Sequence, residues 1–203
     1  MSGPLRIVVA DGHPLYRRGL AGVLAAQPDW AVVAQEDTGA GAVAAALRTG
    51  ADVVVADLDL PHPDVAETAR RIGAVLPGAR ILVLASRDDG AELAGLLRAG
   101  VLGCLPKTDD RSVVVRAVSA VARGDALLPA VAARQVLADA DDLAGRRREV
   151  LELVADGWST ADIAKVLVLS PAAIRAQVTA IVAALRDRPP DAPPRARPRS
   201  RRR

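Results

Sequence analysis

The chain has 203 residues, a formal net charge of +3 and a 51% hydrophobic composition, enough for one large or two smaller domains with buried cores. Its single cysteine, Cys104, excludes an internal disulfide and a cysteine-based zinc site. The first residues have no signal-peptide pattern, and no apolar stretch approaches the roughly 20 residues of a membrane span. We therefore expect a soluble, cytoplasmic protein.

Residues 1–122 alternate between apolar runs of strand length and stretches with helical periodicity. The predicted strands are 5–10, 31–34, 52–56, 80–85 and 101–105, and the predicted helices are 14–26, 40–49, 64–76, 89–99 and 110–122. Such alternation is typical of an α/β fold with a parallel sheet covered by helices on both faces. We predict a flavodoxin-like, doubly wound five-stranded parallel sheet in the order 2-1-3-4-5.

After residue 122 the pattern changes. Residues 123–142 contain Gly124, Pro129 and an acidic run, which predict an interdomain linker with one short helix near 129–138. Residues 143–185 have only helical patterns, at 146–156, 160–167 and 171–185, and predict a small all-α domain. Residues 186–203 contain eight Arg and two Asp, so this segment carries +6 and the rest of the chain −3. We expect a disordered, Pro/Arg-rich basic tail.

Charged residues stand at the ends of three predicted strands. Asp11 ends the first strand, Asp57 the third and Lys107 the fifth. In the order 2-1-3-4-5 the first and third strands are neighbours, so these side chains would share a crevice at the carboxyl edge of the sheet. Two carboxylates and an ammonium suit a divalent cation and a transferred phosphoryl group. The alternative is that they are ordinary polar residues where strands meet loops.

The pair Asp57 and Asp59 also has a second interpretation. An Asp-x-Asp pair at a strand end is typical of haloacid-dehalogenase-type phosphatases, where it supplies a nucleophile and an acid. That family has the pair on the first strand and a cap inserted later in the chain. Here the pair follows the third strand, precedes Leu60 and Pro61, and no cap insertion exists. We expect that the protein is not an enzyme.

Three segments, IVVADGHPLYRRGL (7–20), DVVVADLDLPHPD (52–64) and LRAGVLGCLPK (97–107), resemble the receiver domain of two-component response regulators. Residues 143–185 resemble the LuxR-type helix-turn-helix, so the whole chain resembles the NarL/FixJ class. The resemblance implies that Asp57 accepts a phosphoryl group from a phosphohistidine on a sensor histidine kinase. It also implies that Mg²⁺ binds beside Asp11 and Asp57, and that Lys107 contacts the phosphoryl group. A homodimeric, DNA-binding transcription regulator is the implied function.

The receiver departs from the family pattern at three positions. Gly12 stands where the family has a second acid, so Mg²⁺ binding should be weakened. Ala85 stands at the family's hydroxyl position, and the adjacent Ser86 could replace it only if the strand has already ended. Cys104 stands at the position of the aromatic switch residue. We predict an atypical receiver that acts without phosphorylation, and we expect His13 to begin the first helix rather than to ligate a metal.

In the helix-turn-helix, the second helix would cross the phosphate backbone and the third would enter the major groove. Arg can read guanine and Gln can read adenine. The predicted DNA contacts are Arg175, Gln177, Thr179, Ser170 and Thr160. The predicted inward-facing residues are Ile163, Ala164, Leu167, Leu169, Ile174 and Val178.

Two questions about this end of the chain stay open from sequence. The family's fourth helix, which pairs DNA-binding units, is replaced here by the basic tail, which either contacts DNA phosphates or is simply solvated. The alternative function is a protein-interaction module with a degenerate DNA-binding end. Binding to random duplex DNA at low salt would distinguish the two functions.

Overall fold

A computed structural model describes residues 3–86, 90–139 and 145–186. The elements of the first part, in chain order, are β1 (Leu5–Ala10), α1 (Pro14–Ala25), β2 (Trp30–Glu36), α2 (Gly39–Thr49), β3 (Val53–Asp57), α3 (Val65–Val75), β4 (Arg80–Ala85), α4 (Gly90–Arg98), β5 (Gly103–Pro106) and α5 (Arg111–Ala122). The elements that follow are α6 (Ala130–Asp139), α7 (Arg146–Ala155), α8 (Thr160–Val166) and α9 (Pro171–Arg186).

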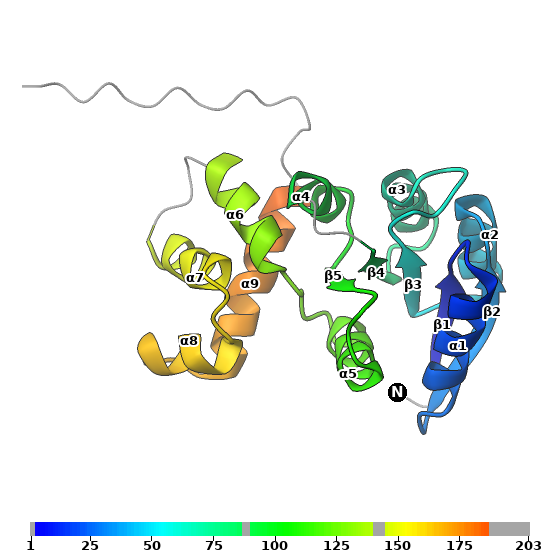
Figure 1. Ribbon diagram of the computed structural model, residues 1–203, viewed down its shortest axis with the longest axis horizontal. Coiled ribbons are helices and arrows are strands. Elements are labelled where there is room, and N and C mark those ends of the chain that lie inside the picture. The colour runs from blue at the N-terminus through cyan, green and yellow to red at the C-terminus, as the bar shows by residue number, and fades with distance from the viewer. Residues whose placement is uncertain (1–2, 87–89, 140–144, 187–203) are drawn as a thin grey trace, which may run out of the picture.

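The five strands form one parallel sheet in the order β2-β1-β3-β4-β5, which confirms the predicted fold class (Figure 1). Successive residues of a strand point to opposite faces, so each strand contributes to two cores. Val8, Val54 and Val83 pack in the core under α2, α3 and α4. Ile7, Val55 and Leu82 pack in the other core, under α1 and α5. The sheet is therefore covered on both faces, and its carboxyl edge is left to carry polar side chains.

One strand is shifted from its predicted position. The apolar run predicted a strand over 101–105, whereas β5 begins at Gly103, which pairs with Leu82. Val101 is fully buried before the ladder begins, so its apolar character reflects burial and not strand pairing. Periodicity alone cannot distinguish the two in so short a run.

The short helix predicted near 129–138, within the linker, is confirmed as α6. In α6, Ala132, Ala133 and Val136 are buried, and the helix packs between α4 and α7. The helical end of the chain therefore lies against the β5 edge of the sheet, beside α4 (Figure 1). Residues 140–142 of the predicted linker, and 187–203 of the predicted tail, lie outside the described residues.

The last two helices have the geometry of a helix-turn-helix. α8 and α9 are bent by 108° at their junction, within the range of about 90–120° typical of this motif. Ser159 caps α8 by accepting a hydrogen bond from Asp162 N at 3.2 Å. The predicted inward-facing residues are buried or half-buried except Leu169, which lies in the turn, where the chain leaves the core, and is exposed. Among the described residues, no single helix is long and apolar enough to cross a membrane.

Candidate functional site

The structure brings together the three charged residues at the carboxyl edge of the sheet. Asp11 directly follows β1, Asp57 is the last residue of β3 and Lys107 directly follows β5. Lys107 Nζ lies 2.8 Å from Asp11 Oδ2 and 2.8 Å from Asp57 Oδ2. The exposed fractions of the two Asp side chains are 2% and 1%, and that of Lys107 is 12%. The ammonium thus bridges two buried carboxylates.

A backbone hydrogen bond and the aromatic ring of Tyr16 hold Lys107 in this position. Its N–H donates to Ala85 O at 2.8 Å, and its Nζ lies 4.6 Å from the centroid of the Tyr16 ring. Burial opposes the charged form, but hydrogen bonds and charge attraction from Asp11 and Asp57 outweigh it, so the pKa of Lys107 is raised above its ordinary value. The side chain therefore remains an ammonium at neutral pH.

The remaining carboxylate oxygens bind backbone N–H groups. Asp11 Oδ1 accepts a hydrogen bond from His13 N at 2.7 Å, and Asp57 Oδ1 accepts one from Asp59 N at 3.2 Å. The guanidinium of Arg17 donates to the carbonyl oxygen of Asp11. These contacts fix the orientation of both carboxyl groups, whereas Asp59, the second acid of the Asp-x-Asp pair, is exposed.

The donor set in the crevice fits Mg²⁺ poorly. Mg²⁺ prefers an octahedral shell of oxygen ligands. Within residues 3–86, 90–139 and 145–186, the group that could hold a metal consists of Asp11, His13 and Asp57, with one ligand atom from each within 4.8 Å of the others. One donor is an imidazole nitrogen, and Lys107 already bridges the two carboxylates. Gly12 supplies no acid, although a Cβ there would meet only Pro61 Cδ, at 3.7 Å.

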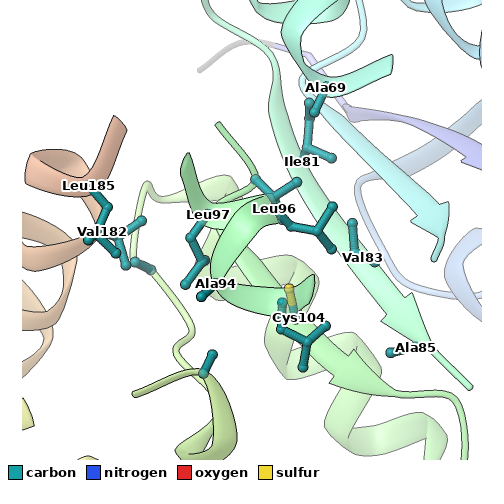
Figure 2. Close-up of a cluster of buried hydrophobic side chains, with 14 of the residues drawn as sticks. Ala69, Ile81, Val83, Ala85, Ala94, Leu96, Leu97, Cys104, Val182 and Leu185 are labelled. Carbon is teal, nitrogen blue, oxygen red and sulfur yellow. The ribbon is translucent and has the colours of Figure 1, made fainter. Parts of the chain in front are cut away.

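Ala85 and Cys104, the residues predicted to stand at the two switch positions, carry neither a hydroxyl group nor an aromatic ring. β4 ends at Ala85, so Ser86 lies just after the strand, where it is exposed. Cys104 is 2% exposed and lies with Ala94 and Leu97 in one apolar cluster (Figure 2). Burial raises the pKa of its thiol to about 12. A small, neutral thiol in this position cannot act as an aromatic ring that moves between two pockets.

Cys104 offers a probe of the contact between the two parts of the chain. Its thiol lines cavities together with Val131 of α6 and Val178 of α9. We expect alkylation by iodoacetamide at pH 8 to be much slower than in the urea-unfolded chain, because the thiol is buried and protonated. Mass spectrometry over time measures the rate; equal rates in the folded and unfolded chains would contradict the packing.

Two of the predicted DNA-contacting residues face the segment that follows α5. Thr179 Oγ1 accepts a hydrogen bond from Ala126 N at 2.9 Å. Arg175 Nε lies 3.7 Å from Asp125 Oδ2. In this conformation, the Thr179 and Arg175 side chains of α9 both contact residues of the same chain.

The other three predicted DNA-contacting residues lie elsewhere on the helical end. Gln177 is half-buried on α9, and Thr160 is half-buried at the start of α8. Ser170 precedes α9 and accepts a hydrogen bond from Ala173 N at 3.1 Å, as a helix cap does. The structure therefore does not gather the five residues on one free surface.

Apolar packing extends the contact between α9 and the receiver. Val182 and Leu185 of α9 lie across from Leu97 of α4 in one buried cluster (Figure 2). Arg98 Nη2 of α4 lies 2.6 Å from Asp139 Oδ2 of α6. Sequence reasoning missed this contact, although the apolar face of α9 continues past the helix-turn-helix core to Leu185 and signals it.

Comparisons with known proteins agree with this architecture. Residues 7–119 match the family model of the response regulator receiver domain. The chain is 30% identical to the uncharacterized transcriptional regulatory protein YxjL of Bacillus subtilis, over 88% of each chain. It is 32% identical to the probable transcriptional regulatory protein NarL of Mycobacterium tuberculosis, again over 88% of each. The solved receiver domain of M. tuberculosis NarL has 31% identity and a TM-score of 0.58, covering 60% of this chain and 98% of that one. The chain therefore belongs to the NarL-type response regulators, which join a receiver domain to a helix-turn-helix.

Proposed function

We propose that this protein is a DNA-binding transcriptional response regulator whose recognition helix is α9. The observation that carries the proposal is the 108° junction of α8 and α9 next to a receiver domain. In such a motif the second helix lies in the major groove and the first crosses the phosphate backbone. The names of its relatives as transcriptional regulators, and not as enzymes, support the same function. Arg175, Gln177, Thr179, Ser170 and Thr160 are the proposed DNA contacts.

In the described conformation, two of the proposed DNA contacts of α9 are engaged within the chain. The Thr179 hydroxyl and the Arg175 guanidinium bind the segment after α5, and Val182 packs against the receiver. Arg175 is partly exposed, but DNA would have to displace both contacts to use these side chains, which is easier once α9 separates from α4. We therefore propose a closed form and an open form, of which only the open form binds DNA.

The receiver is proposed to act without the usual phosphorylation switch. Asp57 is the nominal phosphoacceptor and Lys107 its nominal partner. Lys107 already pairs with both Asp57 and Asp11, Gly12 contributes no acid, and Cys104 is no aromatic switch. In this proposal the receiver serves as a regulatory and dimerisation platform. A second copy of the chain would place two α9 helices on two half-sites, and a sensor histidine kinase would be a binding partner.

DNA selection tests this function. We expect the full chain to enrich particular duplexes from a random library at low salt. On the selected site, Gln177→Ala should lose about 1–3 kcal/mol of discrimination at the base it reads, measured by fluorescence anisotropy. The matched control is Gln135→Ala, since Gln135 lies on α6 and its amide donates to Asp139. Equal loss in both variants, or no DNA binding by the wild type, would contradict the proposal.

A protein-interaction module is the second candidate, and one observation favours it. Val166, Val168 and Trp158 are exposed around the helix-turn-helix, and Val168 has an exposed fraction of 88%. Contiguous exposed apolar patches often mark contacts with other proteins, and these three side chains are the candidates for such a patch. Under this alternative, the chain would bind no duplex DNA even at low salt.

A further inference from the structure

A cavity of about 770 Å³ lies at the edge of the sheet where β4 begins, opposite the carboxyl edge that carries Asp11 and Asp57. One side of it is formed by α3, the start of β4 and the end of α4, and the other side by α9. Figure 2 shows two residues of its lining, Ile81 on β4 and Val182 on α9. The cavity therefore lies between the two parts of the chain, and its volume is within the range of about 300–1,000 Å³ of small-molecule sites.

The lining of this cavity is strongly basic. Of the residues that the structure describes, no Asp or Glu lines it, and four arginines do. They are Arg70, Arg80, Arg98 and Arg186. Arg70 pairs with Glu67, and Arg98 Nη2 lies 2.6 Å from Asp139 Oδ2. Within the described ranges, Arg80 and Arg186 have no carboxylate partner, so uncompensated positive charge gathers around the cavity.

Two of these guanidinium groups lie against glycines. A Cβ at Gly124 would meet Arg80 Nε at 3.6 Å, and a Cβ at Gly100 would meet Arg186 Nε at 3.7 Å. The φ angles of these glycines are 89° and 102°, which disfavour any larger residue there. Arg80 Nη1 also donates to Ala122 O at 3.0 Å. A guanidinium has five N–H donors, and Arg80 uses one of them within the described residues, so the others are left for a ligand.

We propose that this cavity binds a small phosphorylated metabolite of the nucleoside polyphosphate class. Guanidinium groups bind phosphate oxygens through paired, charge-assisted hydrogen bonds. A free phosphate would leave most of the cavity to solvent, whereas buried Ile81 and Val182 add apolar surface for a base and sugar. The Thr179 hydroxyl also lines the cavity, and because it accepts from Ala126 N it can donate its own hydrogen to a phosphate oxygen. The proposed binding does not depend on the chain's binding DNA.

The simpler interpretation is that these arginines only stabilise helix ends. Arg80 binds the carbonyl oxygen of Ala122, the last residue of α5, and Arg186 is the last residue of α9, where a cation is favourable. That explains each side chain separately. It does not explain why guanidinium groups from α3, β4, α4 and α9 line one cavity without an acid among the described residues.

Such a ligand would link the receiver to α9. Arg80 belongs to the receiver, whereas Arg186 and Thr179 belong to α9, so a polyphosphate that contacts both sides stabilises the closed form and not the open one. This consequence rests on the proposed function, in which the ligand then weakens DNA binding. Arg80 is not a proposed DNA contact, so replacing it distinguishes inhibition through the cavity from direct competition at α9.

Calorimetric titration of the full chain with ATP, GTP, AMP and inorganic pyrophosphate, without Mg²⁺, tests the binding. We expect saturable binding of a nucleoside triphosphate, about tenfold tighter or more than that of AMP or pyrophosphate. Arg80→Gln and Arg186→Gln should each weaken it by about tenfold or more, as expected for the loss of a hydrogen bond between charged groups. Arg186 is exposed at a helix end, so its variant should fold. Arg18→Gln, on an exposed position of α1 outside the cavity, is the matched control and should bind as the wild type does.

The same variants identify binding elsewhere on the chain. Residues 187–203 hold further arginines, and unchanged binding in both cavity variants would assign the nucleotide to that segment. Equal weakening in Arg18→Gln would mean diffuse charge attraction. Either result, no binding at millimolar nucleotide, or pyrophosphate binding as tight as that of the triphosphate would overturn the proposal.

DNA binding in the presence of the nucleotide tests the consequence separately. A saturating nucleoside triphosphate should raise the Kd for a selected duplex in the wild type and not in Arg80→Gln, measured by fluorescence anisotropy. Equal inhibition of both would show competition at α9 and overturn the link through the cavity. A chain that binds the nucleotide through Arg80 and Arg186 but binds no DNA would support the cavity and reject the proposed function alone.

Discussion

Replacing Thr179 with valine and Asp125 with alanine is expected to tighten duplex DNA binding by about tenfold, which is about 1.4 kcal/mol, because the closed form loses more than the one DNA contact that the Thr179 hydroxyl would make. The hydrogen bond from Ala126 N to Thr179 Oγ1 is 2.9 Å long, and Ala126 is buried. Its loss leaves a buried N–H unpaired, at a cost of about 1–3 kcal/mol to the closed form only. The ion pair of Asp125 with Arg175 is partly exposed and adds little. Anisotropy with a selected duplex measures the change.

Thr179→Ser is the matched control, since serine keeps the hydroxyl that accepts the hydrogen bond. We expect its DNA affinity to stay within about threefold of wild type. The Cys104 alkylation rate should rise in the double variant and not in Thr179→Ser, because the thiol lies beside the contact that opens. Weaker DNA binding in the double variant would mean that Thr179 serves DNA contact more than closure.

Lys107→Met should lower the free energy of unfolding at pH 7 by roughly 3–5 kcal/mol. Removing the ammonium leaves the carboxylates of Asp11 and Asp57, each almost fully buried, with no counter-charge from Lys107. Urea unfolding followed by circular dichroism measures the difference. Lys165→Met is the control, because the chain's other lysine pairs with Asp162 at 2.9 Å on an exposed surface and should contribute little.

A second substitution and the pH dependence test the cause of this loss. Adding Asp57→Asn to Lys107→Met should recover part of the stability, because it removes one uncompensated buried charge. The pKa of Lys107 is raised in the folded chain, so its stabilisation is fully present below the ordinary lysine pKa of about 10.4 and is lost as pH rises above the folded pKa. A difference between wild type and Lys107→Met that falls between pH 7 and 9 would contradict this assignment.

The sheet and the ends of its strands could be predicted from the sequence because each rests on local patterns. The strand Val53–Asp57 is apolar up to its last residue. Such an uninterrupted apolar run predicts a central strand, because a central strand of a parallel sheet is covered on both faces. Parallel strands bring their carboxyl ends to one edge, so Asp11, Asp57 and Lys107 had to meet once the strand order was assumed. The end of the fourth strand could be predicted in the same way, because its apolar run stops at Ala85. β4 ends there and leaves Ser86 outside the strand.

The contact between α9 and the receiver was missed, because the apolar face of α9 that continues to Leu185 shows that something covers it, whereas packing between segments far apart in the chain decides what does. The short helix predicted near 129–138 is confirmed as α6, but its linker-like composition, with small residues such as Ala132 and Ala133, gave no sign that the helix packs between α4 and α7. Arg175 and Thr179 have the residue types of DNA contacts, and nothing local indicates that they instead bind Asp125 and Ala126. The direction of the His13 ring is likewise set by the neighbouring carboxylates rather than by helix propensity.

The most direct test of the account is DNA affinity before and after incubation with acetyl phosphate and Mg²⁺, with Asp57→Asn measured in parallel. We predict that the wild type binds its selected duplex, that its Kd changes by less than about twofold on this treatment, and that Asp57→Asn responds in the same way. An Asp57-dependent fall in Kd of tenfold or more, or the absence of DNA binding under every condition, would contradict a DNA-binding regulator with a phosphorylation-independent receiver.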